Sequence, residues 1–218
     1  MKIDAVSARF VLEAIDPRTE CPTSDVAFDV DDTDELCRII RVKTAVFDSG
    51  AEYELQERDL GQLKLRYKIA FQPASRVVRL RRWRSLDDLP YKAHTGRELA
   101  LMLEGKKPLA CFSGQYPPHP DVEEISERLF DPYVAARRFV RREHVTSALG
   151  RSMRIVMYAL PDQDWRIDAM ILLIETGAKS GWSEGLERMQ GSLLGYEEWQ
   201  NDIYIEKIFR RANVKDEG

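Results

Sequence analysis

The stretch MRIVMYALPDQDWRIDAMILLI, residues 153–174, holds two largely apolar segments separated by four polar residues. A short apolar run between turn residues is typical of a buried strand. The connection, Pro161 to Asp164, consists of residues that favour turns. We therefore expect residues 153–160 and 165–174 to form an antiparallel hairpin at the centre of a sheet.

A second hairpin is predicted near residues 53–83. Leu63, Leu65, Tyr67, Ile69 and Phe71 alternate with mostly polar residues, which is the period of a half-buried strand. Residues 72–75 can form a turn, and residues 76–83 can return as the partner strand.

Helices are expected over 33–42, 95–104, 121–142 and 182–209. Asp32 or Thr33 can cap the first helix, and Thr95 with Glu98 has the spacing of a capping box for the second. The fold class expected is α+β, with a mainly antiparallel sheet built from hairpins and several packing helices. A single domain over 1–218 is the first expectation, and a boundary near 86–95 is the alternative.

Composition excludes several classes of protein. The chain has 218 residues, a net charge of −4 and 44% hydrophobic residues, which suits a folded domain. No apolar run reaches the roughly 18 residues that span a bilayer, and the N-terminus lacks the apolar core of a signal peptide. We therefore expect a cytoplasmic protein with no membrane partner.

No cofactor or metal site is predicted. Cys21, Cys37 and Cys111 are widely spaced, and the three histidines lack ligand spacing. The acidic segment that begins at Asp29 fails the EF-hand pattern, because its sixth residue is Asp34 where the pattern needs Gly and its twelfth is Ile40 where the pattern needs Glu. No glycine-rich nucleotide-binding motif and no nucleophile elbow is present.

The charge is unevenly distributed. The segment KLRYKIAFQPASRVVRLRRWR, residues 64–84, carries eight basic residues and no acidic one, which leaves the rest of the chain with a net charge of −12. Like charges at this density repel unless a counter-charge is near. Three sources are open: the protein's own carboxylates such as Glu52, Glu54 and Glu57, a second subunit, or an external polyanion.

A partner-binding or polyanion-binding surface is one hypothesis for this segment. A flat strand pair rich in arginine suits an acidic protein surface or a nucleic acid, with Tyr67 and Trp83 available for stacking. The candidate residues are Lys64, Arg66, Lys68, Arg79, Arg81, Arg82 and Arg84, with Arg137 and Arg141 as a possible extension of the patch.

A polar pocket is the enzymatic hypothesis. Its candidate catalytic groups are His94, Asp168, Glu184 and Glu187, because such side chains can exchange protons with a substrate. Its candidate ligand contacts are Arg166, Trp182, Tyr196 and Trp199. The structural alternative is that Arg166 pairs with Asp168 and that the aromatic residues belong to the core.

Three functions follow in order of preference. The first is a cytoplasmic interaction protein that meets an acidic partner surface, or its own second subunit, through the basic hairpin. The second is a nucleic-acid or phosphate-ligand binder that uses the same hairpin. The third is a small enzyme with the polar pocket, and no motif in the sequence specifies its reaction.

Overall fold

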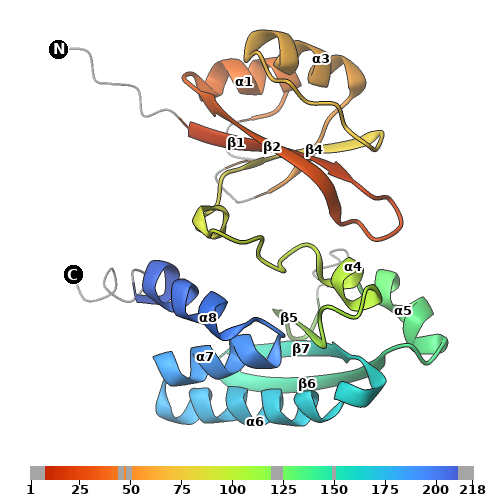
Figure 1. Ribbon diagram of the computed structural model, residues 1–218, viewed down its shortest axis with the longest axis vertical. Helices are drawn as coiled ribbons and strands as arrows, with labels where there is room; N and C mark the ends of the chain where they lie inside the picture. Colours follow the sequence, from red (N-terminus) through yellow and green to blue (C-terminus); the bar gives the residue numbers. More distant parts are fainter. Residues whose placement is uncertain (1–7, 44–46, 48–50, 119–124, 149–150, 211–218) are drawn as a thin grey trace. The chain divides into compact units, whose positions relative to one another are not determined.

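The computed structural model describes residues 8–43, 47, 51–118, 125–148 and 151–210, and it contains two compact units, Met1–Asp88 and Leu89–Gly218 (Figure 1). Each unit contains helices and one antiparallel sheet, so the predicted α+β class with hairpin-built sheets is confirmed. The division between the units falls inside residues 86–95. The single-domain organisation stays a prediction.

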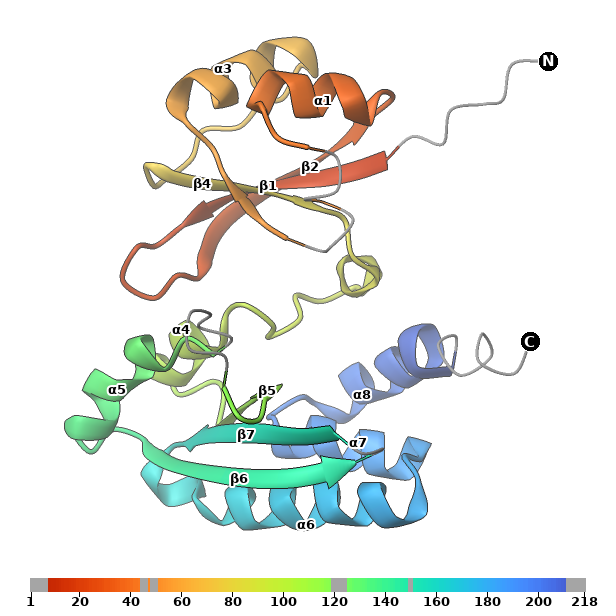
Figure 2. The same cartoon turned by 180° about the vertical axis from the view of Figure 1, so that it is seen from behind.

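The first unit is a four-stranded sheet with helices on one face (Figures 1 and 2). Its strand order is β2-β1-β4-β3, and every neighbouring pair is antiparallel. Its elements are β1 (Ala8–Ile15), β2 (Pro22–Val30), α1 (Thr33–Ile40), β3 (Tyr53–Glu54), α3 (Glu57–Arg66), β4 (Val77–Arg82) and the 3-10 turn η1 (Ser85–Asp88).

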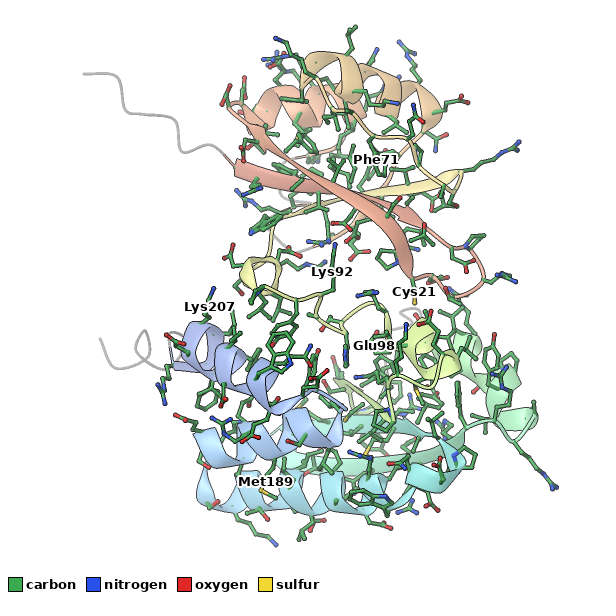
Figure 3. All side chains as sticks on the ribbon, in the orientation of Figure 1. Cys21, Phe71, Lys92, Glu98, Met189 and Lys207 are labelled. Carbon is green, nitrogen blue, oxygen red and sulfur yellow. The ribbon has the colours of Figure 1, made fainter. Side chains whose placement is uncertain are left out.

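Alternation along the strands builds the core of this unit. Phe10 and Leu12 of β1 point toward the helices, where they meet Leu36 of α1 and Leu63 of α3. Phe71 lies in the same core (Figure 3). Burying one such side chain stabilises the fold by roughly 1.5–3 kcal/mol.

The predicted first helix is confirmed, and its start has a clear cause. The Asp32 carboxylate accepts hydrogen bonds from the backbone N–H groups of Asp34 and Glu35 at 2.9 and 3.1 Å. These are two of the donors that a helix leaves free at its first turn.

The predicted hairpin over residues 62–83 is wrong. Residues 57–66 form α3, and the chain then runs without regular structure to β4. Leu63 is buried whereas Leu65 is 84% exposed, so the two lie on different faces of a helix and not on one face of a strand. β4 pairs instead with β1 and β3.

The second unit is a three-stranded sheet in the order β5-β7-β6, again antiparallel. Its elements are α4 (Glu98–Leu103), β5 (Leu109–Gln115), α5 (Glu127–Ala135), β6 (Val140–Ala148), β7 (Arg151–Ala159), the 3-10 turn η2 (Pro161–Gln163), α6 (Trp165–Ser180), α7 (Glu184–Leu193), α8 (Glu198–Tyr204) and the π-helical turn η3 (Ile205–Phe209). The helix α6 packs on one face of the sheet (Figures 1 and 2). On the other face, Phe130 of α5 stacks on Tyr158 of β7 with ring centroids 4.4 Å apart.

The predicted hairpin over residues 153–174 is also wrong. Its first half is β7, but residues 165–174 begin the 16-residue helix α6. Ile167, Met170 and Leu173 of this helix are buried against the sheet, at the three-residue spacing of a helix face. The strand that forms a hairpin with β7 is β6, whose nine residues all pair with it, and β5 pairs with the other side of β7.

Two other predicted helices need correction. The expected helix over 121–142 is limited, within the described residues, to α5, and residues 140–142 already belong to β6. The helix after Thr95 begins at Glu98 with Arg97 as its N-cap and no side-chain cap, so the predicted capping box does not form. The C-terminal helices over 182–209 are confirmed as α7, α8 and η3.

Candidate functional site

Four of the six arginines of the basic segment, Arg66, Arg79, Arg81 and Arg84, bind carboxylates of their own unit. Arg81 of β4 is 8% exposed and lies between Glu13 and Asp87, with nitrogen–oxygen distances of 2.8 and 2.7 Å. Burial alone would raise the pKa of Asp87, but the hydrogen bonds from Arg81 outweigh burial and lower it. The guanidinium of Arg81 is buried and donates its hydrogen bonds to two carboxylates, so it is not available to bind an external anion.

The other predicted basic residues follow the same pattern or lie apart. Carboxylates hold Arg66 (Glu35, 2.6 Å), Arg79 (Glu52, 3.6 Å), Arg84 (Glu52, 2.9 Å) and Arg141 (Glu127, 2.5 Å). Lys64 lies on α3, Lys68 follows it, Arg82 ends β4 and Arg137 follows α5. The positive charge is therefore spread over a helix, a strand and loops, and these ion pairs remove the argument that it awaits an external partner.

The predicted catalytic carboxylates each have a separate partner. Asp168 pairs with Arg142 of β6, and the Glu184 carboxylate lies 3.0 Å from Arg210. Glu187 accepts a hydrogen bond from the indole N–H of Trp182. None of the three contacts His94 among the residues that the structure describes, so the predicted polar pocket does not assemble.

The predicted ligand contacts are structural. Arg166 does not pair with Asp168; it donates to the backbone carbonyls of Ser192 and Leu193 at 2.9 and 3.2 Å. Trp182 packs over Gly177 of α6. Two of the aromatic residues do come together, because Trp199 and Tyr196 both contact Tyr91.

A buried polar cluster around Lys107 was not predicted from the sequence. The Lys107 side chain, which is 2% exposed, donates to His94 Nδ1 and to the carbonyl of Leu194, both at 3.3 Å. The His94 ring stacks on Tyr196 at 4.0 Å, and the His94 backbone N–H donates to the Tyr196 hydroxyl at 2.8 Å. Glu98, at the start of α4 (Figure 3), favours the charged lysine because the negative charge of its carboxylate raises the pKa of Lys107.

Burial sets the protonation of this cluster. It lowers the pKa of His94 to about 4, with help from the Lys107 charge, and it lowers the pKa of Lys107 to about 8. His94 is therefore neutral at pH 7, and its Nδ1 accepts a hydrogen bond from the charged Lys107 side chain. Lys107 is too deeply buried to contact a substrate. The hydrogen bonds of the cluster instead link residues 91–96 to the segment before β5 and to the connection between α7 and α8. The one sequence signal for it is a lysine placed directly before an apolar strand.

The second feature missed from the sequence is the free edge of β6. This strand pairs with β7 on one side, and no backbone partner lies on its other side among the described residues (Figure 2). In an antiparallel strand every second residue directs its N–H and C=O groups away from a given neighbour. Such a row of free groups is a template for another strand.

Charged side chains on an edge strand usually prevent pairing with another chain, but the charges on β6 are already paired with side chains of its own unit. Arg141 and Glu143 form a closed ring with Glu127 of α5 and Arg154 of β7, with nitrogen–oxygen distances from 2.5 to 3.1 Å. Arg142 pairs with Asp168 of α6. The charges on β6 are thus held by its own unit.

Two polar side chains of α6 contact this strand. Asp168 pairs with Arg142, and Glu175 lies 3.8 Å from His144. Leu172 and Trp165 are 66% and 54% exposed, and they lie on the solvent-facing side of α6, because at 3.6 residues per turn they point away from the buried face of the helix.

No protein-family model, no curated protein and no solved structure matches the chain. Among the described residues, no helix combines the length and the apolar character needed to cross a bilayer. The same residues contain no group of three or more His, Cys, Asp or Glu side chains arranged to hold a metal ion. The cytoplasmic location stays a prediction.

Proposed function

We propose that this chain is an interaction protein that binds another polypeptide by adding a β-strand at the free edge of β6. The observation that carries the proposal is the unpaired edge of a nine-residue strand whose charges are held within its own unit. Strand addition supplies affinity through main-chain hydrogen bonds and specificity through side chains beside the edge.

The proposal keeps the interaction function predicted from the sequence but moves the binding surface. The basic segment 64–84 is a weaker candidate because Arg66, Arg79, Arg81 and Arg84 are bound to carboxylates. The free edge of β6 is a stronger one because its outer backbone groups have no partner among the described residues, while its charged side chains are held by its own unit.

A strand probe tests the proposal. A fluorescein-labelled peptide with the β6 sequence VRREHVTSA is titrated with the full chain, and its anisotropy is compared with that of a scrambled peptide. We expect the first peptide to bind and the scrambled one to bind at least several-fold more weakly. Val145→Glu places a negative charge at the edge, where the native side chain is 43% exposed, and should weaken binding several-fold.

The matched control is Leu65→Glu, which changes an exposed leucine of α3 in the other unit. It should leave peptide binding unchanged. If neither peptide binds, or if both variants behave as the unmodified chain does, the strand-addition proposal is wrong.

A further inference from the structure

We infer that the strand added to β6 is the β6 of a second copy of this chain, antiparallel to the first and with His144 on the two-fold axis. This inference rests on the proposed function, and it names the partner. It also gives a specific form to the second-subunit partner that the sequence analysis left open.

The distribution of charge along β6 is the first argument. The charged residues lie in the first half of the strand at 141–143, and the second half at 145–147 is Val-Thr-Ser. An antiparallel copy centred on His144 places Arg142 opposite Thr146 and Glu143 opposite Val145. No charged side chain then lies opposite a like charge, whereas a parallel, in-register copy would oppose every like pair.

The length of the pairing is the second argument. Centring on His144 pairs all nine residues from Val140 to Ala148, and any other centre leaves part of the strand unpaired. The two three-stranded sheets would join into one antiparallel sheet of six strands, and the two free edges would both disappear. A self-complementary patch of this kind is what a two-fold interface requires.

The position of α6 is the third argument. His144 and Arg142 contact α6, so they point to the helix-covered face of the sheet. Residues directly opposite in an antiparallel pair share a face, which places the two α6 helices on the same face, on either side of the axis. The two helix-covered faces are therefore continuous across the axis.

A cysteine placed on the axis tests this geometry in the full-length chain. His144→Cys brings two thiols to directly opposite positions, where paired Cβ atoms lie about 4.5–5.5 Å apart, near the range that a disulfide spans. We expect oxidised glutathione to convert this variant to a reducible dimer. Ser147→Cys is the control, because its two copies lie about 20 Å apart along the strand. The unmodified chain measures any background from Cys21, Cys37 and Cys111.

Sedimentation adds a measurement that needs no cysteine. The chain should show a monomer–dimer equilibrium, and Val145→Glu, which places a carboxylate opposite Glu143 of the other copy, should raise its dissociation constant at least about tenfold. Leu65→Glu should leave it unchanged. Cross-linking of Ser147→Cys as readily as His144→Cys would overturn the axis placement. A chain that stays monomeric at high micromolar concentration and does not cross-link at position 144 would overturn the inference, and the proposed function would still stand if the strand peptide binds.

Discussion

Single residues in this protein are engaged mostly with their own chain. Glu127 shows this most clearly, because its two oxygens accept from Arg141 and Arg154 at 2.5 and 2.6 Å. Burial would raise the pKa of Glu127, but the two arginines outweigh burial and hold it below the ordinary value of 4.5. The ionised form is therefore preferred in the folded state, and it stabilises the ring beside β6.

A substitution at Glu127 should expose this contribution. Glu127→Gln is expected to lower the free energy of unfolding by about 1 kcal/mol at pH 7. Because the folded pKa lies below the unfolded one, the contribution is present above pH 4.5 and is lost as the pH falls further. Urea unfolding at pH 7 and below pH 4 measures it. Glu104→Gln, in an exposed pair with Lys106, is the control and should change stability little.

His94 should titrate with the same sign as Glu127 but in a higher pH window. Burial lowers its pKa from 6.5 to about 4, so the unfolded chain binds more protons than the folded chain between these values. The free energy of unfolding should therefore decrease as the pH is lowered through this window, by at most about 1.4 kcal/mol per pH unit from this group. His94→Gln keeps an acceptor for Lys107 but cannot titrate, so its urea unfolding should depend less on pH there. Parallel losses in both proteins would exclude this role.

Elements were predicted well where a local cap decided them and poorly where two periods competed. The helix at residue 33 has an aspartate cap and acids in its first turn, and both act locally. In residues 62–71 the apolar alternation was real, but Leu65 is exposed and the local helix formed instead. In residues 165–174 almost every position is apolar, so periodicity does not separate a strand from a buried helix. The 16-residue element that forms, Trp165–Ser180, is too long for a typical strand.

Two glycines should respond in opposite ways to the same substitution. Gly61 lies in α3 with open space around its missing side chain, so Gly61→Ala should stabilise the fold by about 0.5–1 kcal/mol. Gly195 has a φ of +90°, and an added Cβ would lie 2.4 Å from Pro108. Gly195→Ala should therefore destabilise the fold by more than about 1 kcal/mol. Thermal melts of the two variants measure both, and equal shifts would contradict the assignment of these turns.

At the scale of the whole molecule, the candidate sites depend on contacts that sequence spacing does not contain. The partners of Arg81 are 68 and 6 positions away, and Lys107 meets Leu194 87 positions away. The sequence did contain the correct alternative for the basic segment, since Glu52 was named as a possible counter-charge. The free edge of β6 could not be predicted, because residues 140–142 were assigned to a helix.

The overall charge leads to a prediction about polyanions. The chain has a net charge of −4, and Arg66, Arg79, Arg81 and Arg84 of the basic segment are paired with carboxylates, so we expect weak heparin retention at low salt. Arg79→Gln with Arg84→Gln should leave that retention nearly unchanged and lower the melting temperature, because both side chains bind Glu52. Strong retention that this double variant abolishes would restore the nucleic-acid hypothesis.

The most direct test of binding along β6 is amide hydrogen exchange in the full-length chain, followed by mass spectrometry at rising protein concentration. We expect exchange in residues 140–148 to slow as concentration rises, and exchange in residues 77–82 of β4, which has a partner on both sides, to stay constant. In Val145→Glu the slowing should shift to higher concentration. Exchange of the β6 amides that is the same at every concentration, and the same after the β6 peptide is added, would contradict the account.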